Sequence, residues 1–268
     1  VQPVARDEAS RFGILKVESD GHITSFVEKP KDPEVQKRYV SRDDPQRPFL
    51  GSMGIYMFKT KVLADLLTYH LRHDDFGGDI IPESIQSHEV YGFDFDGYWE
   101  DIGTIRSFYE TNLKLTSSEP PFNFYDVKAP IYTHARFLPG STVEESRLQD
   151  VLLAEGCRIR RAEITHSIVG IRSQIAEGTV IKDSIVMGAD YYASEKPQGN
   201  IPIGIGRNCH IESAILDKNV RIGDGVVILP FPPNYKDMDG KFYYVRDGIV
   251  VIAKDTEIPA GTRIAPGA

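Results

Sequence analysis

Cysteine is scarce in this chain: Cys157 and Cys209 are the two cysteines among 268 residues. Two thiols are too few for a disulfide framework, so we expect a reducing compartment, with both thiols simply packed in the interior. Long apolar runs are also missing, and none approaches the roughly 20 residues that span a bilayer. No charged segment followed by an apolar stretch comes after Val1, so the printed sequence predicts no secretory signal.

Positive charge is in short supply as well. The chain has 31 lysines and arginines against 39 aspartates and glutamates, which gives a net charge of -8 and an isoelectric point near 5.4. An acidic surface repels polyanions, so we expect neither nucleic acid nor a membrane to be a partner. The length allows two domains.

The first domain is expected over residues 1–115, where short strands and helices alternate. Runs of β-branched and aromatic residues predict strands at 13–17, 23–27 and 52–58. A helix is predicted behind Thr60, and a second helix near Thr104. This alternation indicates an α/β sheet. Ser, Glu and Pro then mark a linker at 116–130.

The second domain, residues 131–268, follows a different period. Aliphatic residues recur at intervals of six in three series: Val169, Ile175, Ile181 and Met187; Leu216, Ile222 and Ile228; Ile252, Ile258 and Ile264. A period of six suits a triangular coil in which each short face contributes one inward side chain. Loops rich in Pro, Gly, Asn and Asp interrupt the coil at 191–203 and 230–246.

Three segments place polar groups beside glycine, proline or an aromatic residue. They are Phe26-Val27-Glu28-Lys29-Pro30, Gly51-Ser52-Met53-Gly54-Ile55-Tyr56 and Gly97-Tyr98-Trp99-Glu100-Asp101-Ile102-Gly103-Thr104. Taken singly, they would be a charged turn, a Gly-Ser turn and acidic residues at a helix entry. In this order they resemble glucose-1-phosphate adenylyltransferase (ADP-glucose pyrophosphorylase) of the plant and cyanobacterial type. The match runs from Ala5 to Ile264.

The resemblance implies a fold for each domain. The first would be part of a Rossmann-like α/β nucleotidyltransferase domain, on its sugar-phosphate side, and the second a left-handed parallel β-helix of hexapeptide repeats. The handedness follows from the resemblance, because the general rule for parallel crossovers points the other way. The family's Gly-rich nucleotide-binding loop, followed by Thr-Arg-Leu, is not found in the sequence. We therefore expect the C-terminal part of a longer enzyme that is inactive on its own.

The resemblance also implies a reaction and its residues. ATP and glucose 1-phosphate would give ADP-glucose and pyrophosphate, for glycogen or starch synthesis, with Mg²⁺ as cofactor. Lys29 would bind the sugar phosphate, and Asp101 would be a Mg²⁺ ligand; both are predicted as catalytic. The sugar site would further include Glu28, Ser52, Gly54 and Trp99.

Regulation and assembly are further implications of the resemblance. A phosphorylated effector would bind the basic residues His134, Arg136, Lys218 and Lys254. The full-length protein would form a homo-oligomer, expected to be a tetramer, with contacts through residues 131–268. The expected location is the cytoplasm, or the plastid if the chain comes from a plant.

Three alternatives stay open at this point. The chain could be a non-catalytic regulatory subunit of the same enzyme, or another sugar-1-phosphate nucleotidyltransferase that transfers a uridylyl or guanylyl group. It could also be a hexapeptide-repeat acyltransferase, but His166 and His210 show no evident acidic partner in the sequence.

His70 and His73 are predicted as ordinary surface residues, and Asp79 as a helix cap in Asp75-Phe76-Gly77-Gly78-Asp79.

Overall fold

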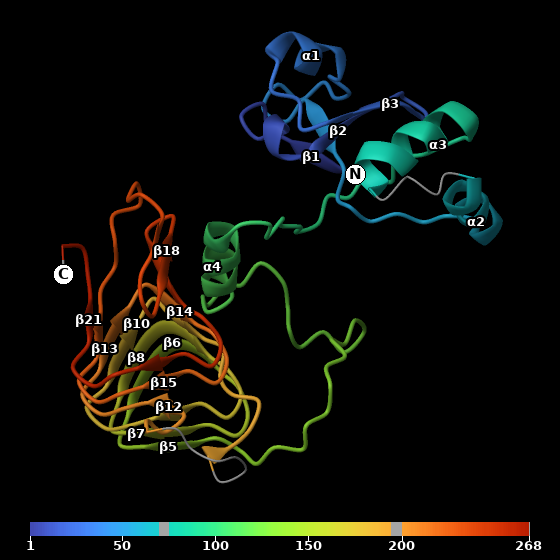
Figure 1. Ribbon diagram of the computed structural model, residues 1–268. Coiled ribbons are helices and arrows are strands. Elements are labelled where there is room, and N and C mark those ends of the chain that lie inside the picture. Colours follow the sequence, from blue (N-terminus) through green and yellow to red (C-terminus); the bar gives the residue numbers. More distant parts are fainter. Residues whose placement is uncertain (70–74, 194–199, 268) are drawn as a thin grey trace. The chain divides into compact units, whose positions relative to one another are not determined.

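The computed structural model describes residues 1–69, 75–193 and 200–267, and it divides into two compact units, Val1–Trp99 and Glu100–Ala268 (Figure 1). His70 and His73 lie outside the described residues. Within the described ranges, no helix is long and apolar enough to cross a membrane.

A four-stranded antiparallel sheet organises the first unit, in the order β1-β4-β2-β3. β2 therefore lies between β4 and β3. Val4, Ala9, Ile14 and Phe49 form the buried core of the unit. The elements are β1 Gln2–Val4, η1 Ala9–Arg11, β2 Gly13–Val17, β3 Ile23–Glu28, α1 Pro33–Arg38, β4 Phe49–Gly51, α2 Thr60–Tyr69, η2 Phe76–Ile80 and α3 Ile81–Ser87.

The strand predicted at 52–58 is wrong. β4 ends at Gly51, and residues 52–58 form no strand. Gly54 has a φ of 69°, which breaks an extended backbone, and the side chains of Ile55 and Met57 are exposed. The apolar composition of the segment is typical of a strand, but no described strand pairs with it.

The second unit begins with α4 Ile105–Lys114 and continues as parallel coils (Figure 1). One sheet of the coils has the order β20-β15-β12-β9-β7-β5, and the other runs along β19-β14-β11-β8-β10-β13-β16-β21 with β6 paired to β8. β17 and β18 form a hairpin that pairs antiparallel with β19.

The strands of the second unit are short. Their bounds are β5 Thr142–Glu144, β6 Arg147–Leu153, β7 Arg158–Arg160, β8 Glu163–Val169, β9 Gln174–Ile175, β10 Val180–Lys182, β11 Ile185–Val186, β12 Gly204–Ile205, β13 His210–Glu212, β14 Ala214–Leu216, β15 Arg221–Ile222, β16 Val227–Ile228, β17 Met238–Asp239, β18 Tyr244–Arg246, β19 Ile249–Ile252, β20 Glu257–Ile258 and β21 Arg263–Ile264.

Inward aliphatic side chains stack in one row for each face of the coil, as the period of six predicts. The rows, aligned by the strand pairing, are Ile159, Ile175, Ile205, Ile222 and Ile258; Ile164, Ile181, Ile211, Ile228 and Ile264; Val169, Val186, Leu216 and Ile252. Cys157 and Cys209 are buried in the same core, as expected. Each fully buried aliphatic contributes about 1.5–3 kcal/mol, so this core stabilises the unit.

Met187 departs from the predicted row. Val186 takes the inward position, where it pairs with Val169 and Leu216, and it is buried in the coil core. Met187 instead packs on the outside against the cluster that contains Leu113 of α4. The interval from Ile181 to Val186 is five residues, as it is from Ile164 to Val169 and from Ile211 to Leu216.

α4 packs on this outer face. Leu113 is buried against Ile185, Ile215 and Ile249, with Phe108 and Tyr109 beside them. The division into compact units therefore falls between Trp99 and Glu100, ahead of the helix. The sequence boundary near 115 counted this helix with the first domain, and that assignment of domains stays a prediction.

Candidate functional site

The Glu28–Lys29 turn leaves the end of β3 in a strained backbone conformation. Lys29 has a φ of 44°, in the left-handed region that a side chain other than glycine rarely adopts. Its amide donates a hydrogen bond to the carbonyl of Phe12 at 3.1 Å. Its ammonium lies 3.4 Å from Glu28 Oε1 and is mostly exposed, so it is open to an anionic ligand.

Ser52 lies directly after β4 on the other side of β2. Its amide donates to the carbonyl of Gly13 at 2.7 Å, and its hydroxyl shares a 2.9 Å hydrogen bond with the hydroxyl of Tyr56. The amide of Gly54 donates to Ser52 Oγ at 3.3 Å. Glycine is required at position 54 by its φ, since no neighbouring atom would obstruct a side chain there.

Phe12 and Gly13 join the predicted residues into one arrangement. Gly13 pairs with Glu28 on β3 and accepts the Ser52 amide from the β4 side. A Cβ at Gly13 would lie 2.8 Å from Glu28 Oε2 and 2.4 Å from the ring of Phe26, so the position requires glycine. Neither residue was among the predicted site residues, although Gly13 opens a predicted strand.

Trp99 reaches the same residues through an aromatic contact. Its ring centroid lies 5.6 Å from that of Phe12, with the rings tilted by 57°. The indole is half-buried. The structure therefore brings together Glu28, Lys29, Ser52 and Trp99, all of which touch the Phe12–Gly13 segment.

The Asp75–Asp79 segment lies beside Glu28. Asp75 caps η2, because its carboxylate accepts hydrogen bonds from the amides of Gly77 and Gly78 at 3.0 and 3.1 Å. The predicted cap at Asp79 is therefore wrong, and Asp79 lies within the first turn. A Cβ on Gly77 would come 3.4 Å from Glu28 Oε2, so a glycine here leaves room for that carboxylate.

Tyr56 is a further residue of this arrangement that was not among the predicted site residues. Besides its bond to Ser52, its ring stacks on Phe76 at 6.0 Å with an interplanar angle of 13°. The stacking orients the hydroxyl that faces Ser52. The string from Ser52 to Tyr56 in the sequence was the signal that could have indicated this role.

Asp101 belongs to the second unit, three residues ahead of the α4 cap. Thr104 caps the helix in a capping box: Thr104 Oγ1 accepts from the Ser107 amide at 3.0 Å, and Ser107 Oγ accepts from the Thr104 amide at 3.1 Å. Asp101 is exposed. Among the described residues, no group of three or more potential ligands could hold a metal ion. The role of Asp101 as a Mg²⁺ ligand stays a prediction.

Lys218 and Lys254 converge on a carboxylate that the sequence analysis did not identify. Both ammonium groups lie 2.8 Å from Asp190, one on each carboxylate oxygen. Asn219 adds an amide contact at 3.2 Å to Asp190 Oδ2. The hydrogen bonds from Lys218 and then Lys254 hold the pKa of Asp190 well below its ordinary value.

His134 and Arg136 lie on an extended segment before the coils. Arg136 donates to the carbonyl of His134 at 3.3 Å, and both side chains are exposed. In the part of the chain that is described, neither forms a hydrogen bond or ion pair with Lys218 or Lys254. The structure brings together two of the four predicted effector residues.

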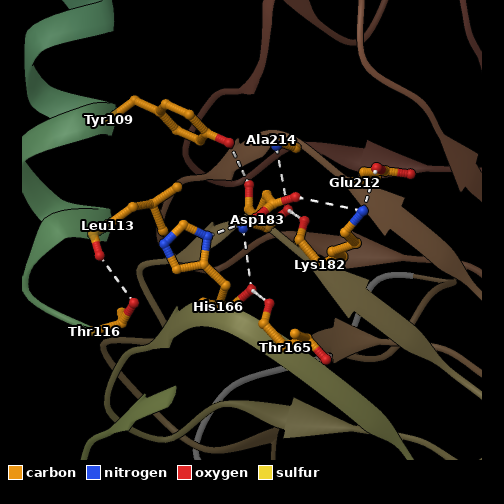
Figure 2. A network of polar contacts seen from close by, with 11 residues as sticks. Tyr109, Leu113, Thr116, Thr165, His166, Lys182, Asp183, Glu212 and Ala214 are labelled. Atoms are coloured by element: carbon orange, nitrogen blue, oxygen red, sulfur yellow. Dashed lines mark hydrogen bonds and ion pairs between the residues drawn. The ribbon is translucent and has the colours of Figure 1, made fainter. Parts of the chain in front are cut away.

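His166 and His210 do have acidic partners, contrary to the expectation from sequence. His166 Nδ1 lies 2.6 Å from Asp183 Oδ1, and His210 Nε2 lies 3.6 Å from Glu212 Oε2. Figure 2 shows the first pair between α4 and the coils, where Tyr109 donates to the carbonyl of Asp183 at 2.5 Å. The His166–Asp183 pair joins successive coils across 17 positions of sequence, which hid it, whereas Glu212 lies two residues after His210 on β13.

Comparisons with known proteins agree with this architecture. Residues 1–118 match the family model described as nucleotidyl transferase, and residues 136–263 match the one described as GLGC left-handed parallel beta-helix domain. The chain is 42% identical over 282 aligned positions to the small subunit of glucose-1-phosphate adenylyltransferase, chloroplastic/amyloplastic, from Triticum aestivum. That alignment covers 98% of this chain and 59% of the wheat protein.

These matches place the chain among nucleotidyltransferases whose catalytic domain is followed by a left-handed β-helix. Within that class, it belongs to the glucose-1-phosphate adenylyltransferase family. The family and the fold class expected from the sequence are thereby confirmed. The chain spans 59% of the length of the wheat relative.

Proposed function

We propose that this chain supplies the sugar-phosphate side of an enzyme that converts ATP and glucose 1-phosphate to ADP-glucose and pyrophosphate. The arrangement of Glu28, Lys29, Ser52 and Trp99 around Phe12–Gly13 carries the proposal. Backbone contacts and the Phe12–Trp99 ring contact bring residues that carry a cation, a carboxylate, a hydroxyl and an aromatic ring to one segment, and these groups suit a phosphorylated sugar.

Each of these residues has a part in the proposed chemistry. The Lys29 ammonium binds the phosphate of glucose 1-phosphate, while Glu28 and the Ser52 hydroxyl accept or donate hydrogen bonds to sugar hydroxyls. One phosphate oxygen then attacks the α-phosphorus of ATP, the bond to the bridging oxygen of pyrophosphate breaks, and pyrophosphate leaves. No covalent enzyme intermediate forms, so the protein acts by positioning and by charge neutralisation.

Asp101 is proposed as a ligand of Mg²⁺. Its carboxylate is exposed and forms no ion pair among the described residues. When bound, the metal ion neutralises charge that develops on the phosphate oxygens. Asp101 would hold it at the entry of α4, where the Thr104 capping box fixes the start of the helix.

Regulation, assembly and location are proposed with the reaction. Lys218 and Lys254 already bind one carboxylate between them, which supports their binding a phosphorylated effector together with His134 and Arg136. We propose a homo-oligomer, a tetramer in the full-length protein, in the cytoplasm or the plastid. The product would serve glycogen or starch synthesis.

Two alternative functions differ from this proposal in turnover or in nucleotide. A non-catalytic regulatory subunit would assemble and bind effectors without turnover. Another sugar-1-phosphate nucleotidyltransferase would use a different nucleotide. In the full-length protein, assays of sugar-nucleotide formation with ATP, UTP and GTP discriminate among the three: the proposal requires ATP to be the preferred substrate, and a regulatory subunit would form no product.

The direct test is glucose 1-phosphate binding, measured by titration calorimetry. Lys29→Ala removes a charge-assisted contact, so affinity should fall about 10- to 100-fold. Lys31→Ala is the matched control. Lys31 lies two residues after Lys29 and is also exposed, so its substitution removes the same charge. An equal loss in both variants, or no loss in Lys29→Ala, would remove Lys29 from the phosphate site.

A further inference from the structure

The backbone at Lys29 needs support from its surroundings. A φ of 44° is unfavourable for a lysine, and the proline that follows at position 30 restricts the preceding residue further. Strain of this kind persists only where neighbouring contacts over-determine the conformation, and it gathers at functional sites. The Phe12 carbonyl is one such contact, because it accepts the Lys29 amide.

Gln36 supplies the contact on the other side of the turn. Its side-chain amide donates a 2.8 Å hydrogen bond to the carbonyl of Pro30. Gln36 is half-buried and Pro30 is buried, so water does not readily replace this bond. Lys29 is thus held between a hydrogen bond at its own amide and one at the next carbonyl.

The short helix α1 fixes Gln36 in place. Asp32 caps its first turn by accepting the Glu34 amide at 2.9 Å. At the other end, the Tyr39 hydroxyl lies 2.8 Å from Ser25 Oγ and donates to the carbonyl of Phe26 at 3.4 Å. The helix is therefore tied back to β3, the strand that leads into Lys29.

We propose that Gln36 is a positioning residue that holds the Lys29 turn in the conformation that binds the sugar phosphate. The inference rests on the proposed function, since it assigns Gln36 an effect on ligand binding that acts through Lys29. Nothing in the motif around Lys29 points to Gln36, which lies outside it on α1. Without the bond to Pro30, the backbone at Lys29 relaxes to a commoner conformation and its ammonium moves away from the phosphate.

Gln36→Met tests this directly, because methionine has nearly the same length and shape but no donor. Losing one neutral, half-buried hydrogen bond should weaken glucose 1-phosphate binding about 3- to 10-fold, measured by calorimetry on the whole chain. Amide hydrogen exchange provides a readout without ligand. The Lys29 amide should exchange faster in the variant, while the amides of the β2–β3 ladder keep their protection.

Glu34→Gln is the control on the same helix. Its carboxylate pairs with Lys37 on the exposed side of α1 and does not touch the turn, so both readouts should stay at wild-type values. Unchanged exchange at Lys29 in Gln36→Met would overturn the inference, as would unchanged affinity. If Lys29→Ala still weakened binding in that case, the proposed function would stand without Gln36. If Gln36→Met instead exposed the whole β2–β3 ladder to exchange, its role would be general stability rather than positioning.

Discussion

At the scale of single residues, backbone conformation and the lack of a side chain shape the candidate site. Lys29 occupies the left-handed region, and Gly13 leaves room for the Glu28 carboxylate and the ring of Phe26. A left-handed residue other than glycine costs about 1–2 kcal/mol, so the contacts to Phe12 and Pro30 must outweigh that cost. These two positions couple the geometry of the candidate site to the local fold.

Asp190 should affect how the unfolding free energy of the second unit depends on pH in the acid range. Its folded pKa is lowered by hydrogen bonds from Lys218 and Lys254, so it contributes stability above its ordinary pKa of 3.8 that is lost as pH falls through the lowered value. Asp190→Asn should therefore make the unfolding free energy of the second unit fall less steeply below about pH 4. Urea unfolding at a series of pH values measures this slope. The effect should be modest, because the cluster is partly exposed.

Asp150→Asn is the control for this measurement. Asp150 is exposed on β6, and its φ of 54° is one that asparagine also accepts, so the substitution removes a charge without a new strain. If both substitutions changed the pH dependence of the unfolding free energy equally, the effect would come from net charge and not from the contacts of Asp190 with the two lysines.

At the scale of elements, α4 is the helix that organises the second unit beyond its coils. The capping box at Thr104 and Ser107 starts it, and Leu113 anchors it on β11, β14 and β19. Arg106 adds a hydrogen bond to the carbonyl of Asp247, beyond the β18 strand. Asp101 lies just before this helix, so the position of a proposed metal ligand depends on how α4 packs.

Tyr109→Phe should change stability at alkaline pH. Burial raises the pKa of Tyr109 to about 12, so the unfolded chain loses the phenolic proton first and stability falls as pH rises from about 10 towards 12. Phenylalanine removes that contribution, and the unfolding free energy of the variant should be flatter over this window. Below pH 9, the variant should be less stable by about 0.5–1.5 kcal/mol, because the hydrogen bond to Asp183 is lost. An alkaline slope identical to that of wild type would show that Tyr109 ionises freely in the folded state.

At the scale of the whole molecule, the two units have separate cores among the described residues. Val4, Ile14 and Phe49 belong to one cluster, and the aliphatic rows of the coils belong to another. Units with their own cores are able to unfold separately.

Two unfolding transitions should therefore be seen by calorimetry, and substitutions should shift them one at a time. Gly13→Ala places a methyl group against the Phe26 ring and should lower only the transition of the first unit. Leu216→Ala opens a cavity in the coil core and should destabilise only the second unit, by about 2–5 kcal/mol. A single transition lowered by both substitutions would show that the units unfold together.

The sequence by itself determined the parts of this protein that depend on local repetition and on short motifs. The period of six specified the coil, because each inward position repeats the same burial requirement in the next face. Thr104 marked the start of α4, since a cap acts within one helical turn. The short motifs also predicted Glu28, Lys29, Ser52 and Trp99 as candidate site residues.

Only the tertiary structure decided what depends on partners far away in the chain. Asp190 meets Lys254 across 64 positions, and Met187 packs with Leu113 of α4 while Val186 takes the inward position. The segment after Gly51 forms no strand because no neighbouring strand pairs with it. A local pattern cannot specify such contacts, because their free energy depends on which distant groups the folded chain brings within a few ångströms.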